Sequence, residues 1–182
     1  MSAPARRLIV LDRDGVINAD SDDYIKSPEE WHPLPGSLEA IARLARAGYD
    51  VVVATNQSGL ARGLFSAETL DAIHARMREA VAAAGGEIKA IYVCPHRPED
   101  DCRCRKPRPG LLERIARDFG LPLDGVPFIG DKLSDVEAAV AVGARPVLVL
   151  TPDGTADAER ARALGAEVYL SLARAVDALL AD

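Results

Sequence analysis

The quartet Asp12-Arg13-Asp14-Gly15 directly follows the apolar run at 8–11. The run predicts a buried strand, and side chains two positions apart on a strand point to the same side. The two carboxylates would then meet just past the strand, where they need a cation or a shared proton. A carboxylate beside a divalent metal can act as a nucleophile, and a protonated neighbour can act as a general acid. The alternative is a structural turn that ends the strand, because aspartate is common in turns.

Polar side chains also follow three further predicted strands, at 50–54, 90–93 and 127–130. In chain order they are Thr55, Asn56, Gln57, Ser58, Arg105, Lys106, Asp131, Lys132 and Asp135. In a parallel sheet these strand ends share one edge, where ligands bind. Several carboxylates at one edge need a metal ion, and oxygen ligands favour Mg²⁺. Thr55 and nearby backbone N–H groups could hold phosphate oxygens, while Lys106 could neutralise the charge that develops on them.

The elements that must position these residues alternate between strands and helices. Further strands are predicted at 146–150 and 167–170, and helical spacing occurs at 37–47, 66–84, 110–119, 134–142, 156–164 and 172–180. Ser66 is the expected N-cap of the second helix, and Ser134 with Glu137 forms a candidate capping box. The alternation predicts an α/β fold with a doubly wound, mostly parallel sheet and helices on both faces. The length indicates one domain over 1–182.

The segment at 12–18 resembles the first motif of the haloacid-dehalogenase-like (HAD) phosphatase superfamily. Thr55, Lys106 and the pair Asp131 and Asp135 resemble its second, third and fourth motifs in order, and the resemblance extends over residues 8–150. It implies a Rossmann-like core without a large cap domain, because the segments at 18–37 and 58–66 are too short to form one.

The same resemblance implies a role for each motif residue. Asp12 would attack the phosphoryl group and form an aspartyl-phosphate, while Asp14 would protonate the leaving oxygen and then activate water. Thr55 and Lys106 would hold the transferring group. Mg²⁺ would be held by Asp12, the carbonyl of Asp14 and Asp131, and Asp135 would orient the metal waters or the loop. The implied activity is Mg²⁺-dependent hydrolysis of a phosphomonoester.

Cys94, His96, Cys102 and Cys104 lie within eleven residues and form a candidate tetrahedral zinc site. The spacing differs from that of ordinary zinc fingers, so the alternative is three free thiols and a solvent-exposed histidine. Zinc would brace a polar loop that leads directly to the motif lysine, and four protein ligands leave no open position for catalysis. Outside this segment, His32 and His74 have no evident partner cluster and are interpreted as surface or helix residues.

The Cys-Pro-His and Cys-Arg-Cys-Arg-Lys-Pro segments resemble a subgroup that acts on D-glycero-D-manno-heptose 1,7-bisphosphate or on histidinol phosphate. The segment at 55–63, with Ser58 where histidinol-type sequences tend to be acidic, and Lys132 favour removal of the heptose 7-phosphate. That heptose is a precursor of lipopolysaccharide core or related glycans. The candidate substrate contacts are Arg13, Asp20, Ser21, Asp22, Asp23, Asn56, Gln57, Ser58, Arg62, Arg105 and Lys132. A bisphosphate has a second phosphate, for which Arg105, Lys132 and Arg62 are the candidate cations.

The acidic loop at 20–24 leaves histidinol phosphate as an alternative, because carboxylates can bind a cationic amine as well as sugar hydroxyls. The formal net charge of -6 disfavours nucleic acid, including a nucleic-acid 3′-phosphatase activity, and a membrane surface as partner. A non-catalytic zinc-stabilised binding module is disfavoured by the Asp12 and Asp14 pair. No apolar stretch reaches membrane-span length and no signal-peptide pattern is present. We therefore expect a cytoplasmic monomer whose partner is a small phosphorylated sugar.

Overall fold

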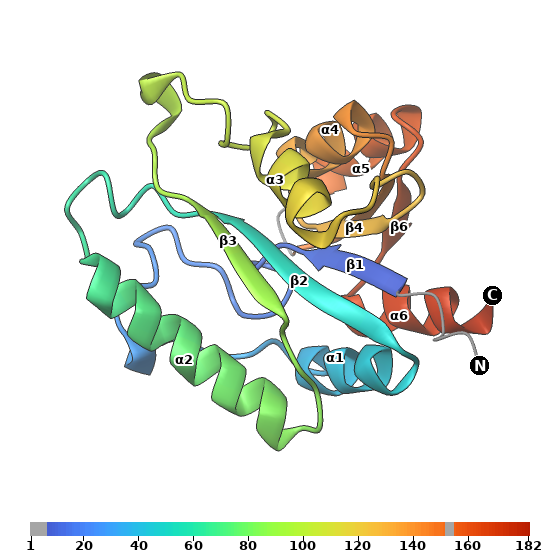
Figure 1. Ribbon diagram of the computed structural model, residues 1–182, viewed down its shortest axis with the longest axis horizontal. Helices are drawn as coiled ribbons and strands as arrows, with labels where there is room; N and C mark the ends of the chain where they lie inside the picture. Colours follow the sequence, from blue (N-terminus) through green and yellow to red (C-terminus); the bar gives the residue numbers. More distant parts are fainter. Residues whose placement is uncertain (1–6, 152–154) are drawn as a thin grey trace.

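Six parallel strands form one sheet in the order β3-β2-β1-β4-β5-β6 in the computed structural model, which describes residues 7–151 and 155–182 (Figure 1). The strands are β1 (Arg7–Leu11), β2 (Tyr49–Asn56), β3 (Ala90–Cys94), β4 (Pro127–Gly130), β5 (Arg145–Val149) and β6 (Glu167–Tyr169). Leu11 of β1 lies opposite Val53 of β2 and Ile129 of β4, so the three strands end at the same edge. The predicted doubly wound parallel sheet is confirmed.

Helices cover both faces of the sheet. They are α1 (Ser37–Arg46), α2 (Ala67–Ala83), α3 (Gly110–Phe119), α4 (Leu133–Ala141), α5 (Thr155–Ala163) and α6 (Leu172–Ala181), with single 3₁₀ turns η1 (Pro28–Glu30) and η2 (Pro98–Asp100). In Figure 1, α1, α2 and α6 lie on one side of the sheet, and α3, α4 and α5 lie on the other. None of the described helices is long and apolar enough to cross a membrane.

The strand β1 contributes to two of the three hydrophobic clusters because its side chains alternate between the two faces of the sheet. Ile9 and Leu11 pack into the cluster that contains residues of α1, α2 and α6. Leu8 and Val10 pack into the cluster that contains residues of α3 and α4. This burial fixes the end of β1 and therefore the position at which Asp12 leaves the sheet.

The predicted element boundaries are close to those observed, with two corrections. Ser66 caps α2 as expected, because its hydroxyl accepts the backbone N–H of Thr69. The capping box of Ser134 and Glu137 was wrong: α4 begins one residue earlier, and the carboxylate that accepts backbone N–H groups at its start belongs to Asp135. The second correction concerns β2, which extends to Asn56 and so includes residues expected after the strand.

Candidate active site

Asp12 and Lys106 form a buried ion pair at the carboxyl edge of the sheet. The Lys106 Nζ lies 3.0 Å from Oδ1 of Asp12 and 2.7 Å from Oδ1 of Asp135, and it donates to the carbonyl of Ala54 at 2.8 Å. One ammonium group therefore joins the ends of β1 and β2 to the first turn of α4. Burial alone would lower the pKa of Lys106, but Asp12 and Asp135 raise it, so this lysine is charged.

Three carboxylates, those of Asp12, Asp131 and Asp135, have oxygen atoms within 4.8 Å of one another. Burial and repulsion by Asp135 raise the pKa of Asp12 well above its usual value, although Lys106 opposes the shift. Oδ1 of Asp131 is buried and has no hydrogen-bond partner among the described residues. A divalent cation would satisfy that oxygen and relieve the crowding, so the chemistry of this site fits Mg²⁺.

Asp135 differs from its two neighbours because both of its oxygens are engaged. Oδ1 binds Lys106, and Oδ2 accepts the backbone N–H groups of Asp131 and Lys132, both at 3.2 Å. These contacts leave Asp12 and Asp131 as the freer carboxylates for a metal ion.

Two glycines in the motifs leave room for the acidic side chains. Gly15 has a φ of 81°, and a Cβ atom at this position would collide with the carboxylate of Asp131. A Cβ atom on Gly130 would likewise collide with Asp135. Any larger residue at either position would therefore collide with a neighbouring carboxylate.

The carboxylate of Asp14 is held by the side chains of three other residues. The Arg13 guanidinium grips its carboxylate, with Nε at 2.9 Å from Oδ1 and Nη2 at 2.8 Å from the same oxygen. Asn18 donates to Oδ1 and Gln57 donates to Oδ2, each at 2.9 Å. Burial would raise the pKa of Asp14, but Arg13 and the two amides lower it overall. Asn18 belongs to the first motif, yet its role in holding Asp14 was not predicted.

The amide side chains at the end of β2 form hydrogen bonds within the protein. Asn56 donates to the backbone carbonyl of Lys106 at 3.2 Å and accepts its backbone N–H at 3.1 Å, so it clamps the lysine from a strand fifty residues away. Gln57 donates to Oγ1 of Thr55 at 2.9 Å. Because that hydroxyl accepts from Gln57, its own hydrogen remains available for a ligand oxygen.

A polar cavity of about 450 Å³ opens above these groups. Its lining includes the predicted residues Asp12, Asp14, Asp20, Ser21, Asn56, Gln57, Ser58, Arg105, Lys106 and Lys132. It also includes Tyr24, Ile25, Pro98, Pro107, Ser134 and Asp135, of which only Asp135 was expected at the site. Lys132 lies 3.0 Å from Asp20 across the cavity and 3.2 Å from Asp131, and thus links the loop after β1 to the end of β4.

Four of the candidate substrate contacts lie elsewhere. Arg13 is 0% exposed and lies against Asp14, so it does not line the cavity. Asp22, Asp23 and Arg62 are exposed and do not line the cavity. The loop at 20–24 therefore contributes Asp20, Ser21 and Tyr24 to the cavity, and not its whole length.

The interpretation of His74 also needs correction. This residue does lie on α2, but it is only 7% exposed, and its Nε2 lies 3.2 Å from Nη1 of Arg13. Burial, followed by repulsion from Arg13, lowers the pKa of His74 to about 4. The contact joins positions 61 residues apart, so no local pattern in the sequence could have predicted it.

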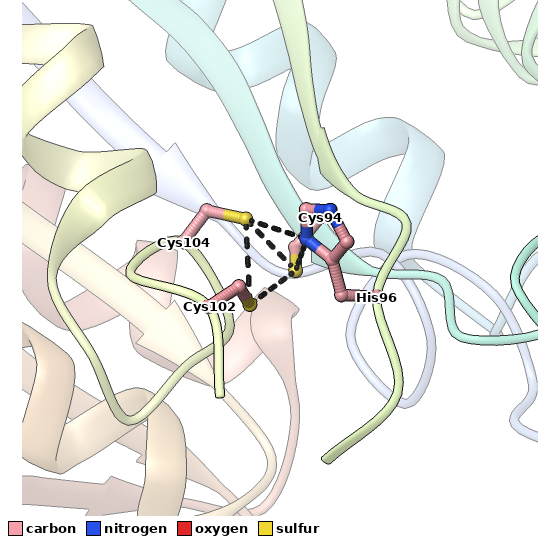
Figure 2. Close-up of side chains that lie close together, drawn as sticks. All are labelled: Cys94, His96, Cys102 and Cys104. Atoms are coloured by element: carbon pink, nitrogen blue, oxygen red, sulfur yellow. Dashed lines mark hydrogen bonds between the residues drawn. The ribbon is translucent and has the colours of Figure 1, made fainter. Parts of the chain in front are cut away.

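Cys94, His96, Cys102 and Cys104 converge at the edge of the sheet beyond β3 (Figure 2). Sγ of Cys104 lies 3.1 Å from Sγ of Cys94, 3.7 Å from Sγ of Cys102 and 3.3 Å from Nδ1 of His96. Sγ of Cys94 lies 3.7 Å from Sγ of Cys102. A tetrahedron with metal–sulfur bonds of about 2.3 Å has edges of about 3.8 Å. The two distances from Cys102 are close to such an edge and the distance between Cys94 and Cys104 is shorter, so the four donor atoms are near enough to share one metal ion.

Comparison with known proteins gives concordant matches. Residues 103–175 match the family model described as HAD-hydrolase-like. A relative from Pseudomonas aeruginosa, D-glycero-beta-D-manno-heptose-1,7-bisphosphate 7-phosphatase, is 52% identical over 176 residues, or 97% of this chain and 99% of the relative. The protein of the same name from Pseudomonas putida is 56% identical over 154 residues, or 85% of this chain and 88% of the relative.

A solved structure extends these matches to three dimensions. The D,D-heptose 1,7-bisphosphate phosphatase of B. bronchiseptica, complexed with magnesium and phosphate, is similar with a TM-score of 0.89 and 51% identity. The similarity covers 96% of this chain and 98% of that one.

The sheet order and the acidic edge with its buried lysine define a HAD-like hydrolase. Within that class, identity of 52% over 97% of the chain decides the family. The chain belongs to the D-glycero-beta-D-manno-heptose-1,7-bisphosphate 7-phosphatases.

Proposed function

We propose that this chain is a Mg²⁺-dependent phosphatase that removes the 7-phosphate of D-glycero-beta-D-manno-heptose 1,7-bisphosphate. The observation that carries the proposal is the meeting of Asp12, Asp14 and Lys106 at the floor of a polar cavity. The substrate is the one named for the relatives from both Pseudomonas species.

Asp12 attacks the phosphorus of the 7-phosphate, so that a bond from its carboxylate oxygen to phosphorus forms while the bond from phosphorus to O7 breaks. Asp14 gives O7 its proton and then accepts a proton from the water that hydrolyses the aspartyl-phosphate. Inorganic phosphate and heptose 1-phosphate leave. Arg13, Asn18 and Gln57 favour the ionised form of Asp14, and a phosphate dianion beside it would oppose that effect because like charges raise a carboxyl pKa.

Lys106 and Thr55 balance the charge on the transferring group. Lys106 already faces the Asp12 carboxylate at 3.0 Å, and the Thr55 hydroxyl can donate because Gln57 occupies its acceptor side. Asp12, Asp131 and the carbonyl of Asp14 would hold Mg²⁺, which supplies positive charge at the phosphoryl oxygens. The engaged oxygens of Asp135 support an orienting role, in which this residue fixes Lys106 and the start of α4.

The remaining cavity residues would hold the rest of the substrate. Arg105 and Lys132 line the cavity and are suited to the second phosphate, whereas Asp20 and Ser21 are suited to sugar hydroxyls. Ser58 is buried at the cavity wall and is neutral, which favours an uncharged sugar over a cationic amine.

The four-residue cluster at Cys94, His96, Cys102 and Cys104 would hold a structural Zn²⁺. Three sulfurs and one imidazole suit zinc, and four protein ligands complete its tetrahedron. The bound ion would tie the end of β3 to the segment that presents Arg105 and Lys106.

We further propose that residues 1–182 act as one domain and as a monomer in the cytoplasm, without a nucleic-acid partner.

Release of inorganic phosphate tests this function directly. The wild-type chain should release phosphate from the β anomer with Mg²⁺, lose activity after chelation, and regain it when Mg²⁺ is added back. Asp12→Asn should reduce turnover at least about 1000-fold, because it removes the nucleophile. Turnover by this variant at the wild-type rate would overturn the mechanism. A higher kcat/KM for histidinol phosphate than for either heptose anomer would overturn the substrate.

A further inference from the structure

His74 contacts the active site from behind, through Arg13. The Arg13 guanidinium uses Nε and Nη2 for the Asp14 carboxylate, and Nη1 points the other way, 3.2 Å from Nε2 of His74. Arg13 is 0% exposed, so the contacts of its guanidinium are all inside the protein. A chain of three side chains thus runs from α2 to Asp14.

The contact fixes the proton arrangement on His74. A guanidinium has only N–H donors and no acceptor, so Nε2 of the imidazole must accept from Nη1. The imidazole is therefore neutral and carries its proton on Nδ1. Arg13 in the loop after β1 and Arg78 on its own helix also disfavour a charged imidazole, whereas Asp14 favours one. Asp71 lines the surface groove beside His74.

We propose that His74 is a positioning residue for Asp14, because it holds the Arg13 guanidinium in the orientation that grips the Asp14 carboxylate. The inference rests on the proposed function, in which Asp14 is the acid and base. Without an acceptor at Nε2, a buried charged N–H would lose its partner, which is costly. Arg13 would then turn toward other acceptors, and the carboxylate would lose its fixed direction toward the leaving oxygen.

The leaving group separates this role from a general effect on folding. An alkyl phosphate such as the heptose bisphosphate needs a proton on its leaving oxygen, whereas p-nitrophenyl phosphate leaves without one. We therefore expect His74→Leu to lower kcat/KM about tenfold for the heptose bisphosphate and less than about twofold for p-nitrophenyl phosphate. A merely structural role would lower both values equally, and that result would overturn the proposal.

Three further variants serve as matched controls. His74→Gln places an amide oxygen near the position of Nε2 and should restore most of the lost activity, whereas His74→Asn is too short and should not. Met77→Ala removes another buried side chain of α2 and should lower the melting temperature without changing the ratio of the two kcat/KM values. Equal behaviour of the Gln and Asn variants would contradict a role for the acceptor.

Nuclear magnetic resonance tests the contact independently of any activity. Long-range ¹⁵N–¹H spectra should show His74 with a proton on Nδ1 and none on Nε2 at neutral pH, and the signal should be absent from His74→Gln. A proton on Nε2 would overturn the inference even in an active enzyme. If the wild-type chain released no phosphate from either ester, the proposed function would fail, while the observed tautomer would still decide whether Arg13 donates to His74.

Discussion

The position of Lys106 depends on Asn56, a residue that also lines the cavity. Asn56 donates to the backbone carbonyl of Lys106 and accepts its backbone N–H, and the ammonium group of this lysine reaches Asp12 at 3.0 Å. Both charged groups of this pair are buried, so the ammonium has little freedom to find another position. The strength of the ion pair therefore follows from backbone placement as much as from charge.

Removing the clamp should weaken catalysis more than binding. Asn56→Ala deletes both hydrogen bonds to Lys106, and we expect kcat to fall about tenfold with KM changed less than about threefold. Asn56→Asp keeps the acceptor but loses the donor, so its kcat should be intermediate. Steady-state kinetics on the heptose bisphosphate measure both constants. A wild-type kcat in Asn56→Ala would show that Lys106 is held by other contacts.

His74 should make the folded state sensitive to mild acid. Its pKa is about 4 in the folded chain, below the ordinary value of 6.5, so the unfolded chain binds the extra proton first. Stability should therefore fall as the pH drops from about 6.5 to 4, by an amount on the order of 3 kcal/mol for this residue. Urea unfolding at pH 7 and pH 5 measures the loss. In His74→Gln the loss should be smaller by the share that His74 contributes.

At the scale of elements, the pattern of apolar runs was sufficient to predict the sheet and its helices. The apolar runs of β1, β2 and β4 are buried, and a buried strand appears in the sequence as a short continuous apolar run. The start of α4 was misjudged because the sequence offers several polar residues for capping, and only the fold decides that Asp135 accepts the backbone N–H groups. The Asn56 clamp and the His74 contact could not be predicted because they join distant segments.

The loop after β3 should lose its function when its cluster is broken. His96→Asn removes one of four donors that lie within reach of a single metal ion, and we expect bound zinc to fall from about one equivalent to well below it. Activity should fall with it, because the same loop carries Lys106. His32→Asn alters a histidine outside the cluster and should change neither quantity. Metal content measured by mass spectrometry tests the predicted loss of zinc. Full zinc retention in His96→Asn would refute the assignment.

At the scale of the whole molecule, the cavity is built without an inserted domain over the described residues. Its walls come from the loop after β1, the end of β2 with the residues that follow it, the cysteine-containing loop and the start of α4. These four segments are brought together by the strand order, which puts β1 between β2 and β4. Substrate selection must therefore depend on single side chains of these loops.

Substitutions of two cationic residues, Lys132 and Arg62, can test whether the cavity residues select the substrate. Lys132 lines the cavity and Arg62 does not. We expect Lys132→Gln to raise KM for the bisphosphate about tenfold, because a phosphate loses its charged partner. Arg62→Gln should leave KM within about twofold of the wild-type value. Equal effects of the two substitutions would show that the cavity residues do not select the substrate.

The contact between Lys132 and Asp20 has a consequence for turnover. The two charged groups meet at 3.0 Å, and both side chains remain about half exposed to solvent. An exposed ion pair contributes only about 0 to 1 kcal/mol, so parting it is a small barrier compared with moving a domain. An incoming phosphate can displace the carboxylate of Asp20 from the ammonium, and the carboxylate can return as the product leaves. Entry and exit would then be exchanges of one anion for another at the Lys132 ammonium.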